Sequence, residues 1–329
     1  MARGVTAKDV AREAGVSQAT VSYVINNHPG QKISAPTRER VKAAIERLGY
    51  TPSESARALR TGSTNVVLLV LPDIPFGPSL GFLSEHIADE LEQFGLTTIT
   101  RRVRESSPLA SLWRALNPVA VVSIAAISLD DEAEMLESGI AVVSTLLSPA
   151  SGRQGISVPQ TLIGRLQVEH LAYAGHRRIG YAAPDDERVA DFYRLRLDGV
   201  RTACLELGLD QPDLVPVALD ADSGTAAVAH WRSLPDPVTA VAAYNDETAF
   251  AVLAGMNRLG LVAPRDLAVI GVDNIPLAAL ASPPLTTVDQ NLEMVAAFVA
   301  RQIASVTHGV PAPQPLRSDA VSLVLRESA

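Results

Sequence analysis

Residues 5–27 read VTAKDVAREAGVSQATVSYVINN, and the first half of this stretch has the pattern of a short amphipathic helix. Val10 and Ala14 are about one helical turn apart and therefore share a face. Thr6 stands before the helix as an N-cap, and Asp9 follows three residues later, which resembles a capping box. The pattern predicts a helix that begins after Thr6 and buries one narrow apolar face.

A tight turn and a second short helix follow. Gly15 ends the first helix, Ser17 caps the second, and Val21 and Val24 face inward. This spacing predicts a helix-turn-helix, whose second helix enters the major groove of DNA. A plain three-helix bundle with a solvated second helix is the alternative interpretation. The candidate DNA contacts are Thr6, Ser17, Gln18, Ala19, Thr20, Ser22, Tyr23 and Asn26.

The residue types in the second helix suit DNA. A glutamine such as Gln18 can pair bidentately with adenine, and a small side chain such as Ala19 can touch a thymine methyl group. Short polar side chains such as Thr20 and Asn26 suit phosphates, which position a protein without reading the sequence.

A third helix and a polar segment complete the N-terminal region. Ser34 is a cap, and Val41, Ile45 and Leu48 form an inner stripe at helical spacing. Residues 51–62, TPSESARALRTG, are polar and short, so a helix formed there is marginal on its own. We expect a helix-turn-helix domain in residues 1–50, a hinge in 51–63 and a larger body in 64–329.

Charge is distributed unevenly along the 329 residues, whose formal net charge is −8. Residues 1–63 contain ten Lys and Arg against five Asp and Glu, a net of +5. The rest contains 18 against 31, a net of −13. A basic head on an acidic body is typical of a DNA-binding module joined to a part that avoids DNA.

The body alternates buried strands with amphipathic helices. Apolar runs begin with VVLLVL at 66–71 and recur as VAVVSI, AVVST, RIGYAA, AVAAYN and LAVIGVD, with a helix predicted over 79–94 and a strand over 96–100. Apolar strands that alternate with helices predict parallel sheets covered on both faces. Their number predicts two α/β lobes around a cleft.

Polar residues stand where such a cleft binds ligands, at the carboxyl ends of strands. Asn245 follows one predicted strand, Asp273 follows another, and Arg196 is placed at the start of a helix. An amide, a carboxylate and a guanidinium suit a polyhydroxylated ligand. The alternative is that Asn and Asp merely cap helices and form turns.

At this point a family resemblance becomes specific. D-V-A, A-G-V-S, T-V-S and V-I-N in residues 5–27, and SAPTRERVKAAIERLGYTPSESARALRTG at 34–62, resemble the DNA-binding head and hinge of the lactose-repressor/galactose-repressor (LacI/GalR) family. Further segments resemble the family body, in family order: GHRRIGYAA, RLRLDGVRTAC, AVAAYNDETAFAVLAGMNRLG, APRDLAVIGVDNIPLAAL and SPPLTTVDQNL.

The resemblance implies a sequence-specific regulator, expected to be a repressor, that binds a pseudo-palindromic operator as a homodimer. It implies that the hinge folds on DNA, with Leu59 wedged into the minor groove between Arg57 and Arg60. It also implies a body resembling periplasmic sugar-binding proteins, crossed three times by the chain, with a first lobe at about 64–160 and 289–316 and a second at about 161–288 and 317–329.

In the cleft, the resemblance makes Arg196, Asn245 and Asp273 the effector contacts of the second lobe, and Phe76 is a candidate ring-stacking residue of the first. The effector is expected to be a sugar or a related polar metabolite. Two departures matter. Tyr23 replaces the Arg of well-known sugar repressors, so their operator preference does not transfer. Pro159 and Gln160 replace a frequent Asp-Asn pair, so a same-family regulator without effector sensing is the alternative function.

Other classes of protein lack support in the sequence. P-loop, GxGxxG, GxSxG and HExxH motifs are absent, so no enzyme, cofactor or metal site is expected. A sugar-transport receptor of the same body fold would need a signal sequence, which the first residues do not resemble. No apolar stretch is long enough for a membrane span. With Cys204 as the one cysteine and no heptad tail, we expect a cytoplasmic dimer.

Overall fold

The computed structural model describes residues 5–25, 33–50, 64–103, 109–125, 127–144, 158–314 and 321–329. By its contacts the chain divides into two compact units, Met1–Thr64 and Asn65–Ala329.

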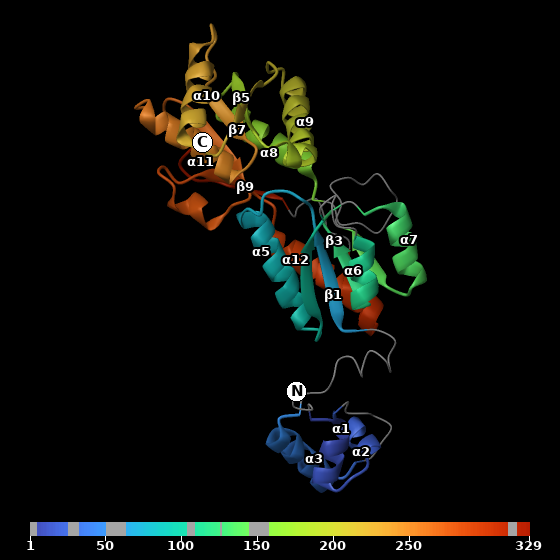
Figure 1. Cartoon of the computed structure of the whole chain (residues 1–329). Coiled ribbons are helices and arrows are strands. Elements are labelled where there is room, and N and C mark those ends of the chain that lie inside the picture. Colours follow the sequence, from blue (N-terminus) through green and yellow to red (C-terminus); the bar gives the residue numbers. More distant parts are fainter. Residues whose placement is uncertain are drawn as a thin grey trace. The chain divides into compact units, whose positions relative to one another are not determined.

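The N-terminal unit is a three-helix bundle, composed of α1 (Ala7–Ala14), α2 (Gln18–Ile25) and α3 (Ala35–Leu48) (Figure 1). Val10, Val21 and Val41 contribute one fully buried side chain from each helix. The turn between α1 and α2 depends on Gly15, whose φ of 65° lies in the left-handed region that other residues adopt at a cost. The apolar stripes that the sequence predicts are therefore the ones that form this core.

The first lobe of the second unit is a parallel sheet in the order β2-β1-β3-β4. Its strands are β1 (Val66–Leu71), β2 (Thr97–Arg102), β3 (Ala120–Ser123) and β4 (Ala141–Ser144). Its helices are α5 (Pro78–Glu92), α6 (Leu109–Leu116), α7 (Leu129–Glu137) and α12 (Leu292–His308).

Strand β1 shows how this sheet is covered on both faces. Alternate residues, among them Val67 and Leu69, pack into one core with α5 and α12, whereas Leu68 and Val70 pack into a second core with α6 and α7. All four are fully buried. A continuous apolar run is therefore required, because both side-chain directions of the strand lead into a core.

The second lobe is a six-stranded sheet in the order β10-β9-β8-β7-β5-β6, parallel except for β10 against β9. Its strands are β5 (Ile179–Pro184), β6 (Asp213–Val217), β7 (Ala240–Ala243), β8 (Ala268–Val272), β9 (Thr286–Asp289) and β10 (Ser322–Val324). Its helices are α8 (Gln160–Tyr173), α9 (Ala190–Glu206), α10 (Ala221–Ser233) and α11 (Asp246–Arg258), with 3-10 turns η1 (Glu187–Val189) and η2 (Pro276–Leu280).

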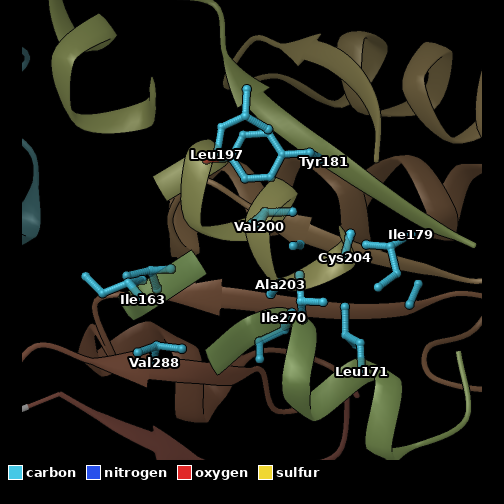
Figure 2. Packing of buried hydrophobic residues seen from close by; sticks show 14 of the residues in the cluster. Ile163, Leu171, Ile179, Tyr181, Leu197, Val200, Ala203, Cys204, Ile270 and Val288 are labelled. Carbon is cyan, nitrogen blue, oxygen red and sulfur yellow. The ribbon is translucent and has the colours of Figure 1, made fainter. Parts of the chain in front are cut away.

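Helices α8 and α9 cover one face of this sheet, and α10 and α11 cover the other. Figure 2 shows the first of these cores, where Tyr181 of β5 lies against Leu197 of α9, and Ile270 of β8 lies among residues of both helices. Cys204 is buried in the same core, where burial raises the pKa of its thiol to about 11. This cysteine therefore serves as a small apolar residue.

Helices α8 and α9 approach closely because each has a glycine at the crossing. A Cβ on Gly164 would lie 2.0 Å from the carbonyl oxygen of Arg196, and a Cβ on Gly199 would lie 2.0 Å from that of Thr161. Both neighbours are backbone atoms, which cannot rotate away. The two glycines thus fix the position of α9, which carries Arg196.

Several boundaries differ from the sequence prediction. The helix expected over 79–94 spans Pro78–Glu92, because the chain turns at Gly95, where φ is 69°. The strand expected over 96–100 extends to Arg102, which pairs with Leu71 of β1. Arg196 was expected at the start of a helix, and this was wrong: α9 begins at Ala190, so Arg196 lies in its second turn.

The chain passes between the lobes between β4 and α8, between β9 and α12, and between α12 and β10. This is the three-crossing body that the resemblance implied.

Candidate functional site

The candidate DNA-reading surface is the exposed N-terminal end of α2. Val21 and Val24 point into the bundle, while Ser17, Gln18 and Ala19 are exposed and Thr20 is half-buried. Residues at the start of the second helix are the ones that reach base edges in a helix-turn-helix. Tyr23 and Ser22, further along α2, are half-buried.

Hydroxyl groups near this surface are engaged in capping. The backbone N–H of Thr20 donates to Oγ of Ser17 over 3.1 Å, and the two hydroxyl oxygens lie 2.9 Å apart. At the start of α1, both the backbone N–H and the hydroxyl of Thr6 donate to Oδ2 of Asp9, at 3.0 and 2.7 Å. The Thr6 hydroxyl hydrogen is thus used within the protein. In this conformation the hydroxyl group cannot also donate a hydrogen bond to a DNA phosphate.

Four of the candidate DNA contacts lie outside the described residues. These are Asn26, Arg57, Leu59 and Arg60.

The second unit contains a cavity of about 510 Å³ between its two lobes. Loops at the carboxyl ends of β1, β5, β6, β7 and β8 contribute to its walls, which is where open α/β sheets bind ligands. Phe76, Arg196, Asn245 and Asp273, the four predicted effector residues, all line this cavity. They come from three loops and one helix, and only the fold brings them together.

Arg196 lies at the centre of a buried network and is 3% exposed. Its Nε donates to Oε1 of Gln160 over 2.7 Å, and its Nη1 donates to the carbonyl oxygen of Tyr244 over 2.6 Å. Its Nη2 lies 3.7 Å from Oδ1 of Asp273, and the guanidinium stacks 4.8 Å from the centroid of the Tyr244 ring. A buried guanidinium group of this kind is tolerated because its nitrogen atoms and its face have hydrogen-bonding, charged or aromatic partners.

Asp273 follows β8 with a φ of 109°. Burial raises the pKa of its carboxyl group, whereas the guanidinium of Arg196 and hydrogen bonds from Ser79 and Gln290 act in the opposite direction. Because Ser79 belongs to α5 of the first lobe, this carboxylate contacts residues on both sides of the cavity.

Asn245 is the N-cap of α11, as its alternative interpretation predicted. Its Oδ1 accepts from the backbone N–H and the hydroxyl of Thr248, at 2.9 and 2.8 Å. Its Nδ2 points toward Glu247 at 3.4 Å. Capping and lining the cavity are compatible, because Oδ1 makes the capping hydrogen bonds while Asn245 also lies in the cavity wall.

Comparisons with known proteins agree with this architecture. Residues 6–53 match the family of bacterial regulatory proteins called lacI, and residues 168–329 match a periplasmic binding protein-like domain. The HTH-type transcriptional regulator GalR of Escherichia coli K12 is 31% identical over 98% of this chain and 95% of its own length. Catabolite control protein A of Priestia megaterium is 32% identical over 90% and 91%. The chain belongs to the LacI family of bacterial regulatory proteins.

Solved structures show the same fold. A lac repressor dimer bound to operator and the anti-inducer ONPF has a TM-score of 0.83 at 24% identity and covers 99% of both chains. The regulator CelR in complex with cellobiose has a TM-score of 0.66 at 29% identity, over 99% of this chain and 100% of CelR. The LacI-family chain is therefore a DNA-binding transcription regulator with a helix-turn-helix head and a periplasmic-binding-protein-like body.

Two glutamines of this LacI-family regulator were missed as members of the cavity network. Gln160, noted in the sequence only as a departure from a frequent Asp-Asn pair, donates from Nε2 to Oε1 of Gln290 over 3.2 Å while it accepts from Arg196. Gln290 in turn donates to Oδ1 of Asp273. Gln160 begins α8 and Gln290 follows β9, so the pair joins two places where the chain crosses between lobes.

Asp246, which follows Asn245 after the end of strand β7, is a further buried group that was not among the predicted effector contacts. It is fully buried and accepts from the hydroxyl of Thr287 at 2.6 Å and from the backbone N–H of Ile275 at 3.0 Å. Burial raises the pKa of Asp246 to about 7, hydrogen bonding from Thr287 opposes the rise, and Asp273 adds to it. Its hydrogen bonds join the start of α11 to β9 and to the residue before η2. They therefore hold together elements that lie beside the cavity.

Two further properties concern the described residues alone. None of their helices has the length and apolar character needed to cross a bilayer. They contain no group of three or more His, Cys, Asp or Glu placed to hold a metal ion. Two of the relatives named above, GalR and CelR, are transcriptional regulators.

Proposed function

We propose that this chain is a transcriptional repressor that binds a pseudo-palindromic operator as a homodimer. We further propose that a small molecule, a sugar or a related polar metabolite, binds between its two lobes and changes the affinity for the operator. Operator binding places the protein in the cytoplasm of a bacterial cell, where the DNA is.

The observation that carries the proposal is the combination, in one chain, of an exposed reading helix and a cavity-bearing body. In α2, Gln18 and Ala19 are exposed while Val21 and Val24 anchor the helix. A single helix-turn-helix offers a small footprint, so two copies on a symmetric site give a useful affinity. By family, Arg57, Leu59 and Arg60 would add minor-groove contacts.

For the effector, support comes from the position of Arg196, Asn245 and Asp273 around one cavity. Their guanidinium, amide and carboxylate groups can make charge-assisted hydrogen bonds, which are comparatively strong. The solved complex of CelR with cellobiose, a sugar, supports an effector of this kind. A ligand changes operator affinity only if it binds the two lobe arrangements differently.

A regulator that has lost effector sensing is the second candidate. It is favoured by the engagement of Arg196 with Gln160 and Tyr244 inside the protein, which reduces the donors available to a ligand. In that case the body would serve mainly to bring two heads together.

Selection of bound duplexes from a random pool tests the DNA half, and we expect a consensus with a dyad. The affinity should fall with salt with a log–log slope near −0.9 per neutralised phosphate. A consensus without a dyad would contradict the proposal.

A screen of sugars and nucleosides for altered binding to the selected operator tests the effector half. With an effector in hand, Asp273→Ala should weaken its binding by about tenfold or more, with unchanged operator affinity in its absence. If no compound changes operator binding by the wild-type protein, the second candidate is the better account.

A further inference from the structure

The first-lobe side of the cavity is almost entirely apolar. Among the described lining residues of α5, α12 and the loops after β1 and β3, Ser79 is the one with a polar side chain, and it lies beside Asp273. Gln160 and Gln290, where the chain crosses between the lobes, are already bonded to Arg196 and Asp273. The apolar wall includes Phe76, Leu80, Leu83, Ile124, Leu292 and Val295. A molecule with hydroxyl groups on both faces would leave one face without partners on this side.

Large apolar side chains are exposed at the cavity. Phe76 of the first lobe is 55% exposed and Leu219 of the second is 64% exposed, and both line it. With the half-buried ring of Phe192 on the second lobe, they offer contact area to an aryl or alkyl group. The occupant therefore has an apolar portion.

Carboxylates dominate the charged groups on the other side. Of the described residues that line the cavity, Asp185, Asp186, Glu247 and Asp273 are acidic and Arg196 alone is cationic. Arg188, which is outside the lining, pairs with Asp186 at 2.7 Å, and Arg196 faces Asp273 at 3.7 Å. In the described part of the chain, no ion pair involves Glu247.

Glu247 lies at the boundary between the lobes. Its Oε2 would be 2.9 Å from a Cβ on Gly77, so the carboxylate reaches across to the loop after β1. Burial raises the pKa of Glu247, and the charge of Asp273 raises it further. Burial also raises the pKa of Tyr244 to about 12, with Arg196 opposing and Asp273, Glu247 and Asp186 adding to the rise, so the carboxylates act on one small region.

The apolar first-lobe wall and the carboxylate-rich second-lobe side favour a ligand with an apolar group at one end and a cationic group at the other. Glu247 accepts a hydrogen bond of 3.4 Å from Nδ2 of Asn245 but forms no ion pair within the described residues. A half-buried carboxylate in this state is costly, and a ligand ammonium group would neutralise it while donating hydrogen bonds. A neutral hydroxyl would desolvate the same carboxylate without neutralising it.

We infer that the cavity binds an amphipathic amine, whose ammonium group lies between Glu247 and Asp273 and whose aryl or alkyl portion packs on Phe76 and the first-lobe wall. The inference rests on the proposed effector function and narrows the effector to one chemical class.

Calorimetric titration of the full-length protein with 2-phenylethylamine tests the inference against three other probes. These are 2-phenylethanol, which replaces the ammonium by a hydroxyl, ethylamine, which lacks the ring, and cellobiose, a neutral polyol. We expect the amine to bind at least about tenfold more tightly than each of them. In Glu247→Gln, the amine and the alcohol should bind equally within about twofold, whereas Glu206→Gln, an exposed change at the end of α9, should preserve the difference.

Equal binding of amine and alcohol by the wild type, equal binding of ethylamine, or binding of cellobiose without the amine would each overturn the inference. An unchanged preference in Glu247→Gln would overturn it too, provided that the variant keeps wild-type circular dichroism and operator affinity. Operator affinity measured with each probe separates this result from the proposed function. If the amine binds without altering operator affinity, the inference about the ligand class is supported and the proposed effector control of operator binding is contradicted. If cellobiose alters operator affinity while the amine does not bind, effector control is supported and the inference about the ligand class is overturned.

Discussion

Nε of Arg196 donates to Oε1 of Gln160 over 2.7 Å, and the two side chains are 3% and 4% exposed. Gln160 is thus the residue through which the start of α8 holds a side chain in the second turn of α9. Gln290 extends the contact to Asp273. The buried polar side chains of the cavity therefore form one connected hydrogen-bond network, in which the position of each side chain depends on that of its neighbour.

Gln160→Leu should lower the free energy of unfolding by about 1–3 kcal/mol, because Nε of Arg196 is left buried without an acceptor. Urea denaturation of the full-length protein measures this. Gln211→Leu provides a matched control, since Gln211 is exposed and the same change there should have an effect within about 0.5 kcal/mol. Equal stability of the two variants would show that the Gln160–Arg196 contact is energetically neutral.

Gly199→Ala should destabilise the body by at least about 1–3 kcal/mol, because a Cβ would lie 2.0 Å from the carbonyl oxygen of Thr161 and force α8 and α9 apart. Asp198→Ala, on the exposed neighbouring position of the same helix, should stay close to wild type. Thermal and urea unfolding compare the two. A stability of Gly199→Ala equal to that of Asp198→Ala would refute the close crossing.

The pH dependence of stability should reveal Asp246. Its folded-state pKa of about 7 lies above the value of about 3.9 for an unfolded Asp, so the folded state binds this proton more tightly. The stability that it contributes below pH ~4 is therefore lost as the pH rises from about 4 to about 7, by up to about 4 kcal/mol.

Asp246→Asn removes this titration and resembles the protonated form: its Oδ1 can accept from Ile275, and its Nδ2 can donate to the hydroxyl of Thr287. The difference in unfolding free energy between variant and wild type should grow in favour of the variant across this pH range. Asp198→Asn serves as the exposed control. Parallel pH profiles for wild type and Asp246→Asn would mean that Asp246 has an ordinary pKa.

Gln18→Ala should cost about 1–3 kcal/mol of operator affinity and relax the preference at one base pair of each half-site. Binding to a set of duplexes with each position of the selected operator changed in turn measures both effects. Gln211→Ala on the body should leave the profile unchanged. A loss of the same size on every sequence would instead assign Gln18 a phosphate-contacting role.

The fold was largely predictable because its signals are local. The face shared by Val10 and Ala14, the cap at Ser34 and the run Val66–Leu71 each follow from a helical or strand period within a few residues. The glycine at position 15 stops α1 through its own backbone freedom. Prediction was wrong for the start of α9 before Arg196. There the segment 190–195 has no cap or stripe that distinguishes its first turn from the 3-10 turn η1 that precedes it.

The candidate site was predictable only in part. Asn245 and Asp273 could be named because strand ends are visible in the sequence, and the structure places them at one cavity. Gln160 and Gln290 could not be paired, because they are far apart in the chain and meet only where it crosses between lobes. It could not be predicted either that Glu247 forms no ion pair within the described residues, because this depends on where the fold places the cations.

The number of chains on one selected operator duplex tests the account most directly. Native mass spectrometry at saturation should show two chains per duplex. Scrambling one half-site should reduce affinity by about a hundredfold or more, as expected if one of two cooperating heads loses its specific contacts. One chain per duplex, with equal affinity for the intact and the half-scrambled sites, would contradict dimeric recognition of a symmetric operator.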